Sequence, residues 1–388
     1  MENFVFQCAT KIIFGKSSEE LLRDELKNYG KRILLHHYGD GVIEKIGLYD
    51  KVIRILQEEG AEIYELTGVK PNPRLSLARE GIQICKEKNI DLILAIGGGS
   101  VIDSAKTIAL GAKYQGDVWD FYTGKSIPQD VLPLGVVLTI PATGSEASDG
   151  AVITNEEGML KRPMHSQLIR PKFSILNPEF TYSLPMFQTA AGSFDIMSHV
   201  MERYFTTTQN VDFTDYLCEA TMVTVKNNLL SVLKNPQDYE ARANIMWAGT
   251  IAHNDLLGTG RAEDWASHMI GHELGAMFDL THGATLSIVT PAWMKYVYKK
   301  HVSRFVQYAV RVWRIEENFE EPEITAEKGI EALEEFLRKI GLPTTLAEGN
   351  VDVCRLEELA DRCTMDGPVG GLEKLYKEDV INILKLAC

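Results

Sequence analysis

Residues 91–103 read DLILAIGGGSVID, and this stretch decides the fold class. Residues 91–96 are almost all apolar, as expected of a parallel strand that is buried on both faces of its sheet. Three glycines and Ser100 follow, and helical apolar spacing then continues to about residue 112. A buried strand, a glycine turn and a helix make up the first part of a βαβ unit. The stretch therefore predicts a parallel sheet with helices on its faces.

The sequence around this stretch repeats the alternation of strand and helix. Strands are predicted at 11–14, 32–37, 61–66 and 131–140, and helices at 18–26, 48–58 and 76–86. Beyond a connector marked by Pro178 and Pro185, the apolar spacing is helical almost throughout. We therefore expect an α/β dinucleotide-binding domain at 1–185 and an all-helical domain at 186–388.

The length and the net charge of the chain indicate how many domains it has and which binding partners are excluded. A chain of 388 residues is long for one hydrophobic core, which agrees with two domains. The formal net charge of −14 argues against nucleic-acid partners and anionic membranes. The sequence has no apolar run long enough for a transmembrane helix and no signal-peptide pattern. Its six cysteines form no CxxC pair, so we expect reduced thiols and a cytoplasmic location.

Two turns in the first domain are candidates for binding a cofactor. Gly97, Gly98, Gly99 and Ser100 precede a helix, where backbone N–H groups and the helix dipole favour a pyrophosphate. The match to the G-x-G-x-x-G fingerprint is incomplete, because the last glycine of the fingerprint is absent from the sequence after Ser100.

Asp40 follows the strand predicted at 32–37, and a carboxylate there can accept hydrogen bonds from the adenosine ribose hydroxyls of NAD. An ordinary turn would also explain both features, so the two interpretations stay open on the residues alone.

The second domain carries a group of candidate metal ligands. His268 and His272 are four residues apart and so share one face of a helix. Asp195 and His199 have the same spacing in an earlier helix. A carboxylate with several imidazoles makes an N/O ligand set for a divalent metal.

His282 is a further candidate, but it lies fourteen residues after His268. In one continuous helix that separation would be about 21 Å. His282 can share a metal with His268 only if the chain turns back after Phe278. Asp279, Thr281 and Gly283 are residue types that end and start helices, so the sequence allows this turn.

Over nearly its whole length the chain resembles the iron-dependent (group III) alcohol dehydrogenases, and within them the butanol dehydrogenase and broad aldehyde reductase branch. The motifs that carry the resemblance are Phe14-Gly15, Lys70-Pro71-Asn72-Pro73, GGGSVIDSAK at 97–106, PATGSE at 141–146, 195–199, 265–283 and Pro291-Ala292-Trp293. The resemblance implies a dehydroquinate synthase-like architecture, with a Rossmann-like parallel-sheet domain followed by an all-α domain. It also implies a homodimer.

The resemblance further implies the roles of individual residues. It implies metal ligation by Asp195, His199, His268 and His282, and it puts His272 beside the nicotinamide and substrate as a candidate proton relay. The implied cofactor-binding residues are Gly39, Asp40, Asn72, Gly97, Gly98, Gly99, Ser100, Asp103, Thr139, Thr143 and Lys161.

One departure from the family pattern concerns the choice of cofactor. NADPH-using relatives carry Gly-Gly-Gly-Ser where this chain has Gly39-Asp40-Gly41-Val42. A carboxylate beside the 2′-phosphate costs roughly 1–3 kcal/mol at an effective dielectric near 20, so we expect NAD(H) to be preferred over NADP(H). Among metals, Fe(II) is expected and Zn(II) is the second candidate.

The predicted activity is metal-dependent hydride transfer between a nicotinamide and a short-chain primary alcohol or aldehyde, such as butanol or butyraldehyde. A glycerol dehydrogenase is a close alternative. A cyclase of the dehydroquinate synthase type would need a cationic cluster for a substrate phosphate, and only Arg203 and Arg261 are near the histidines in sequence. A non-catalytic nucleotide-binding or metal-storage protein would not need both a metal set and a cofactor loop.

Overall fold

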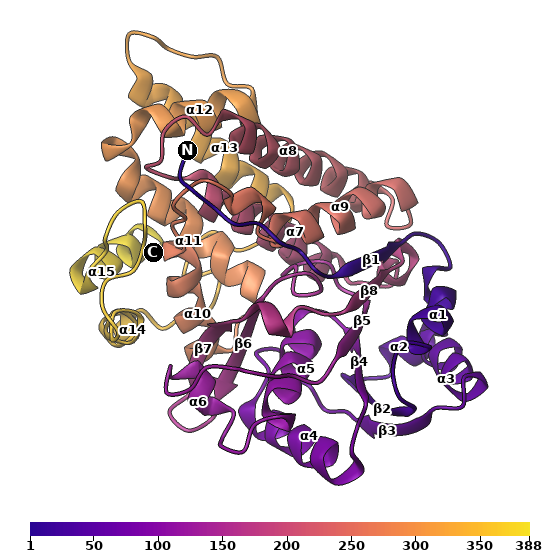
Figure 1. Ribbon diagram of the computed structural model, residues 1–388. Helices are drawn as coiled ribbons and strands as arrows, with labels where there is room; N and C mark the ends of the chain where they lie inside the picture. Colours follow the sequence, from indigo (N-terminus) through magenta and orange to yellow (C-terminus); the bar gives the residue numbers. More distant parts are fainter. The chain divides into compact units, whose positions relative to one another are not determined.

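The computed structural model describes residues 1–388, which form two compact units. The sheet unit consists of 7–184 and 237–254, and the helical unit consists of 1–6, 185–236 and 255–388 (Figure 1). No helix in either unit is both long enough and apolar enough to cross a bilayer.

The elements of the sheet unit are β1 (Lys11–Phe14), α1 (Leu22–Leu26), β2 (Arg32–His37), α2 (Val42–Lys45), α3 (Leu48–Glu58), β3 (Glu62–Leu66), α4 (Leu75–Lys88), β4 (Leu92–Gly97), α5 (Gly99–Ala112), α6 (Trp119–Tyr122), β5 (Leu134–Leu138), β6 (Gly150–Asn155), β7 (Leu160–His165), β8 (Phe173–Leu176) and α9 (Tyr239–Ala252). Those of the helical unit are α7 (Met186–Tyr204), α8 (Asp212–Lys234), α10 (Ala266–Phe278), α11 (His282–Val297), α12 (Val302–Trp313), α13 (Pro322–Lys339), α14 (Leu356–Cys363) and α15 (Lys377–Leu386).

Six parallel strands form the main sheet, in the order β1-β8-β5-β4-β2-β3. The chain leaves β2 toward β3 at one edge and leaves β4 toward β5 on the opposite side. The neighbouring strands β2 and β4 therefore form a topological switch point, and ligands of open α/β sheets bind beyond the carboxyl ends of the strands at such a point. The predicted fold class, a parallel α/β sheet followed by a helical part, is confirmed.

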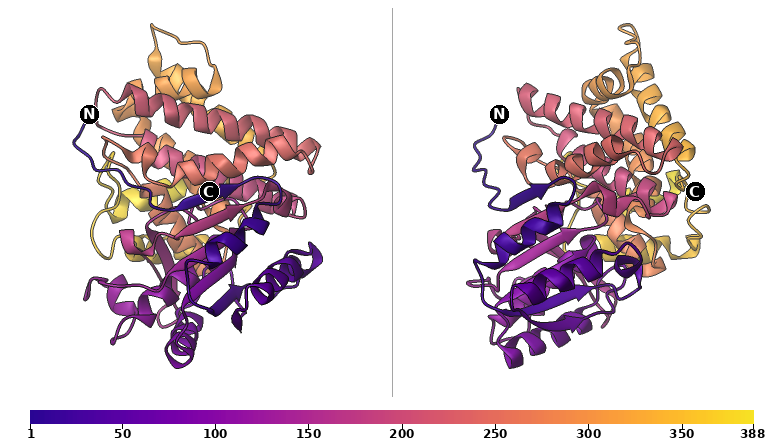
Figure 2. Two further views of the ribbon diagram at one scale, coloured as in Figure 1. Left: turned by 45° about the vertical axis from the view of Figure 1, so that its right-hand side comes forward. Right: turned by 90° about the vertical axis from the view of Figure 1, so that its right-hand side faces the viewer.

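The apolar run of β4 packs on both faces of the sheet. Leu92, Leu94 and Ile96 join a core with apolar residues of α1 and α3. Ile93 and Ala95 join a second core with residues of α4 and α5. All five side chains are fully buried, and burying each Leu or Ile contributes about 1.5–3 kcal/mol. The indigo and purple segments of Figure 2 show this layered unit from two further sides.

Several elements were not predicted from the sequence. The antiparallel hairpin of β6 and β7 has mixed polarity, and β8 is only four residues long, so neither gives a clear periodic pattern. Helix α12 was also not predicted, although its buried Phe305, Val306, Ala309 and Val312 recur at helical spacing. Strand β5 is shorter than the predicted 131–140, since Pro133 and Pro141 lie just outside it and cannot donate to a sheet ladder.

His36 is a fully buried histidine near the carboxyl end of β2. Its Nδ1–H donates to the carbonyl oxygen of Leu66 at 2.8 Å, and its Nε2 accepts from the Ser104 hydroxyl at 2.9 Å. Burial lowers the pKa of His36 from 6.5 to about 4. The folded sheet unit therefore holds this imidazole in its neutral form.

We expect His36 to make the fold sensitive to acid. As pH falls from 6.5 toward 4, the unfolded chain binds a proton on this imidazole before the folded chain does, so stability is lost over that window. Between pH 7 and pH 4.5 the loss amounts to about 2 kcal/mol. Urea unfolding of His36→Asn, measured at both pH values, should show a correspondingly smaller fall. An equal fall in the wild type and in His36→Asn would contradict the prediction.

Candidate active site

The first part of the site lies on α7. Asp195 and His199 are one helical turn apart, and both side chains are buried. The Nδ1–H of His199 donates to the backbone oxygen of Asp195 at 2.8 Å, which fixes the orientation of the ring on α7. Helix geometry thus aims a carboxylate and an imidazole the same way.

The second part lies on α10 and α11, where the chain reverses. Helix α10 ends at Phe278, Asp279 adopts a left-handed backbone with φ 53°, and α11 begins at His282. Gly283 allows α11 to approach α7 closely, because a Cβ at this position would lie 2.1 Å from the backbone oxygen of Ala191. This turn brings His282 and His268 to the same place.

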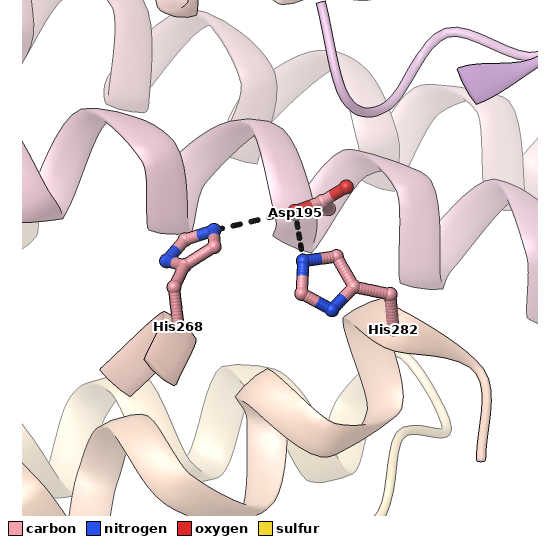
Figure 3. A group of neighbouring side chains, drawn as sticks. All are labelled: Asp195, His268 and His282. Atoms are coloured by element: carbon pink, nitrogen blue, oxygen red, sulfur yellow. Dashed lines mark ion pairs between the residues drawn. The ribbon is translucent and has the colours of Figure 1, made fainter. Parts of the chain in front are cut away.

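The side chains of three residues converge in the helical unit: Asp195, His268 and His282. The Oδ1 atom of Asp195 lies 3.8 Å from Nε2 of His268 and 3.6 Å from Nε2 of His282, and both rings point a nitrogen at the carboxylate (Figure 3). The three ligand atoms all lie within 4.8 Å of one another. Two ligands of a four-coordinate metal with bonds near 2.1 Å are about 3.4 Å apart, so these distances suit a shared ion.

The chemistry of the cluster also fits a divalent cation. Oδ1 of Asp195 and Nε2 of His268 are buried and have no hydrogen-bond partner in the chain, although buried polar atoms are rarely left without one. Burial alone would raise the pKa of Asp195, but the neighbouring histidines hold this pKa well below its usual range. An ionised, buried carboxylate among imidazoles needs a compensating positive charge, and a metal ion would supply it.

The other two predicted histidines lie next to this cluster. His199 is outside the compact group of three, with its ring centre 4.5 Å from that of His268 and its Nδ1 3.2 Å from Oδ1 of Asp195. His272 is half-buried one turn after His268, and its ring centre is 5.2 Å from that of His282. The ring of His272 therefore adjoins the cluster without joining it.

One residue of the site, Glu202, was not singled out from the sequence. Glu202 accepts a hydrogen bond from Nδ1 of His268 at 2.7 Å, and the indole of Trp265 packs against the rings of His199 and His268. Glu202 could have been found, because it lies seven residues after Asp195 and so on the same face of α7.

The candidate cofactor loops lie at the switch point of the sheet unit. Gly97 ends β4, and Gly98 is the N-cap of α5, a helix of 14 residues. A Cβ on Gly99 would lie 2.4 Å from Oγ1 of Thr143, so only glycine permits this approach. The N–H of Thr139 donates to the carbonyl oxygen of Gly97 at 3.0 Å, which holds the end of β5 beside the loop.

Asp40 and its neighbours follow β2, next to β4. Gly39 and Gly41 have φ values of 72° and 78°, in the left-handed region that favours glycine. Asp40 is exposed, and its Oδ1 accepts a hydrogen bond from the N–H of Val42 at 3.0 Å. A turn at the carboxyl end of a strand thus presents a free edge of the carboxylate to solvent.

The remaining predicted cofactor residues already have partners in the chain. Nζ of Lys161, on β7, donates to Oδ1 of Asn72 at 2.9 Å, and both residues are buried. Asp103 accepts from the Ser145 hydroxyl at 2.6 Å and from the N–H of Val152 at 3.0 Å. Burial raises the pKa of Asp103. The structure therefore brings Asn72 and Lys161 together, and it ties Asp103 to the segment that leads into β6.

The chain was compared with protein-family models and with known proteins. Residues 9–178 match the family model of iron-containing alcohol dehydrogenases, and residues 189–388 match the C-terminal model of the same family. The probable NADH-dependent butanol dehydrogenase 1 of Bacillus subtilis is 45% identical over 385 residues, covering 99% of both chains. An NADPH-dependent aldehyde reductase of Escherichia coli is 38% identical, covering 91% of this chain and 90% of its own.

The same likeness holds in three dimensions. The crystal structure of NADH-dependent butanol dehydrogenase A from Thermotoga maritima matches with a TM-score of 0.96 and 40% identity, covering 100% of this chain and 99% of the other. The family descriptions name iron, whereas Zn(II), the second candidate from the sequence, finds no support in these comparisons.

Proposed function

The chain belongs to the family of iron-containing alcohol dehydrogenases, and from this premise we propose that it transfers a hydride between NAD(H) and a short-chain primary alcohol or aldehyde, such as butanol or butyraldehyde. The class, an iron-dependent alcohol dehydrogenase, follows from the family. The substrate is supported by two relatives, from Bacillus subtilis and Thermotoga maritima, that are both named NADH-dependent butanol dehydrogenases.

The observation that carries the proposal is the convergence of Asp195, His268 and His282, with His199 beside them. These four residues would hold the ferrous ion. When bound, the ion supplies Lewis acidity toward the oxygen of the alcohol or aldehyde. The buried carboxylate of Asp195 balances its charge, and the indole of Trp265 covers the rings of His199 and His268.

The residues at the switch point would bind NAD(H), which supplies or accepts the hydride when bound. Backbone N–H groups of Gly97 to Ser100, at the start of α5, are suited to the pyrophosphate. Asp40 would accept hydrogen bonds from the adenosine ribose, which supports the preference for NADH over NADPH. On this proposal 1–185 is the dinucleotide-binding domain and 186–388 the metal-binding domain.

The remaining cofactor residues follow the same proposal. We assign Gly39, Asn72, Asp103, Thr139, Thr143 and Lys161 to cofactor binding. Thr143 is supported by its packing against Gly99, and Thr139 by its hydrogen bond to Gly97.

His272 is proposed to carry the alcohol proton toward solvent. Its ring is half-buried beside the metal ligands, so it can meet both the reacting oxygen and water. His272→Ala should lower turnover on the order of a hundredfold and change the pH profile of turnover, while iron content stays at the wild-type level. Unchanged turnover and an unchanged pH profile would remove His272 from the mechanism.

We also propose a cytoplasmic homodimer. All six cysteines are free, which suits a reducing compartment. Strand β1 is an edge of the sheet, and the segment before it exposes Phe4, Val5 and Phe6. Unpaired edges and exposed apolar side chains favour association with a second copy. Sedimentation velocity at micromolar concentration tests this, and a monomer would contradict it.

The first experiment follows absorbance at 340 nm with Fe(II)-loaded protein, butyraldehyde, and either NADH or NADPH. We expect rapid oxidation of NADH and slower oxidation of NADPH. Faster use of NADPH would keep the enzyme class and overturn the assigned role of Asp40. No oxidation of either cofactor with a series of short aldehydes would overturn the proposed substrate, and activity with glycerol would then favour the glycerol dehydrogenase alternative.

A further inference from the structure

Glu202 is a buried carboxylate that contacts the metal-binding helices without belonging to the ligand set. It lies on α7, three residues after His199, and is 3% exposed. Because residues three and seven apart share a helix face, its side chain points the same way as those of His199 and Asp195. A buried carboxylate is costly unless its oxygens are fully hydrogen-bonded, so the partners of Glu202 indicate what it does.

Both oxygens of Glu202 accept hydrogen bonds from the start of α10. Oε1 accepts from the backbone N–H of His268 at 3.0 Å and from Nδ1 of the same residue at 2.7 Å. Oε2 accepts from the backbone N–H of Trp265 at 2.7 Å. Three donors thus converge on one carboxylate, and all three belong to one turn of one helix.

Two of these bonds cap α10 from outside the helix. Trp265, the N-cap residue, has a left-handed backbone with φ 69° and provides no side-chain cap of its own. The first N–H groups of a helix lack partners within it, and a carboxylate at that end is also favoured by the helix dipole. Glu202 of α7 therefore supplies the cap that α10 lacks, which fixes the position of α10 relative to α7.

The third bond determines which nitrogen of His268 is free. A carboxylate only accepts, so Nδ1 of His268 carries the proton that it donates to Glu202. Nε2 then keeps its lone pair, and this is the atom that lies 3.8 Å from Oδ1 of Asp195 without a hydrogen-bond partner. Carboxylates behind metal-binding histidines orient the ring and raise its basicity in this way.

We propose that Glu202 is a positioning residue of the metal centre, which holds His268 with Nε2 toward the metal and ties its helix to the one that carries Asp195. This inference rests on the proposed metal site and deepens it. Glu202 acts through His268 and touches neither substrate nor cofactor on this account.

The carboxylate of Asp264 links the start of α10 to a segment near the C-terminus of the chain. The N–H of Asp264 donates to the backbone oxygen of Glu202 at 2.8 Å. The Asp264 carboxylate accepts from the N–H groups of Ala266, Gly371 and Leu372 at 2.8–3.1 Å. The start of α10 is thus held on two sides, so the loss of one bond at Glu202 should leave the helix in place while loosening the His268 ring.

The test compares metal affinity and thermal stability in Glu202→Gln, Glu202→Asp and Glu219→Gln. Glu219 is the matched control, a buried glutamate of α8 that hydrogen-bonds Tyr204, Gln307 and Arg311. Affinity is measured with Co(II) against a chelator of known affinity, together with the visible absorption spectrum of the Co(II) protein. Melting temperatures are recorded with and without metal.

We expect Glu202→Gln to weaken Co(II) binding about 10- to 100-fold and to alter the Co(II) spectrum. The neutral amide oxygen is a weaker acceptor than a carboxylate for the Nδ1–H of His268. The NH₂ group of the amide cannot accept a hydrogen bond from the backbone N–H of Trp265. Glu202→Asp keeps the charge, but its shorter side chain cannot reach all three donors, so we expect a similar loss. Glu219→Gln should keep wild-type affinity and spectrum even where its melting temperature falls.

The outcomes separate this inference from the proposed function. If Glu202→Gln keeps wild-type Co(II) affinity and only its melting temperature falls, Glu202 acts as a helix cap alone. That result would overturn the inference. If Glu202→Gln proves insoluble, Glu202→Asp decides the matter by the same criterion. Failure of the wild-type protein itself to bind Co(II) or Fe(II) would instead refute the metal site, and with it the proposed function.

Discussion

Replacing Asp195 with alanine is expected to lower kcat/KM for butyraldehyde by on the order of a thousandfold or more. A metal ion that polarises a carbonyl contributes several kcal/mol to transition-state stabilisation, and each 1.4 kcal/mol corresponds to about a factor of ten. Asp195 is the one carboxylate of the cluster, and its Oδ1 lies within 4 Å of nitrogens from three histidines. Removing it takes away the negative charge that, on the proposed ligand set, would retain a divalent cation.

Metal content and heat stability distinguish this cause from a general loss of folding. A ligand that binds only the folded state raises its melting temperature, so Fe(II) should stabilise the wild type and should stabilise Asp195→Ala far less. Asp215→Asn is the matched control, since Asp215 is a buried aspartate of the same unit that pairs with Arg261 and Arg304. That variant should lose stability and still bind iron. An Asp195→Ala protein that retained bound iron and near wild-type kcat/KM would refute the ligand assignment.

The sequence predicts the sheet well because its central strand β4 is buried on both faces and so must be apolar at every position. Leu92 to Ile96 alternate between two cores, so every position must be apolar and the run is unmistakable. The reversal after Phe278 was also foreseeable, since Asp279 readily adopts the left-handed conformation that ends α10. Local rules of this kind act on neighbouring residues and can be recognised in a sequence.

Features that depend on tertiary partners could not be foreseen. Helix α9 has the same apolar spacing as its neighbours, but it belongs to the sheet unit, where Met246 packs in the core and Thr250 hydrogen-bonds Glu146. The role of Glu202 likewise depends on where α10 begins, because its three donors lie more than sixty residues further along the chain. A periodic pattern identifies a helix face but not the surface that covers it.

Replacing Asp40 is expected to have the second large effect, which is a change in the preference between NADH and NADPH. Asp40 follows β2 at the switch point, between Gly39 and Gly41, with its side chain exposed. A dianionic 2′-phosphate near this carboxylate would be repelled by roughly 1–3 kcal/mol at an effective dielectric near 20. On the proposed binding mode, the ribose hydroxyls of NADH would donate to the same oxygens, so one side chain would both favour NADH and disfavour NADPH.

Asp40→Asn should therefore raise the ratio of kcat/KM for NADPH to that for NADH by about tenfold to a hundredfold. Asparagine can still accept the hydrogen bond from the N–H of Val42, so the turn is kept while the charge is removed. Asp117→Asn is the control, because Asp117 is an exposed aspartate that accepts from the N–H of Trp119 in a similar turn. Its ratio should stay at the wild-type value. A ratio that is unchanged in Asp40→Asn would mean that the turn discriminates by shape, and charge repulsion would no longer explain a preference for NADH.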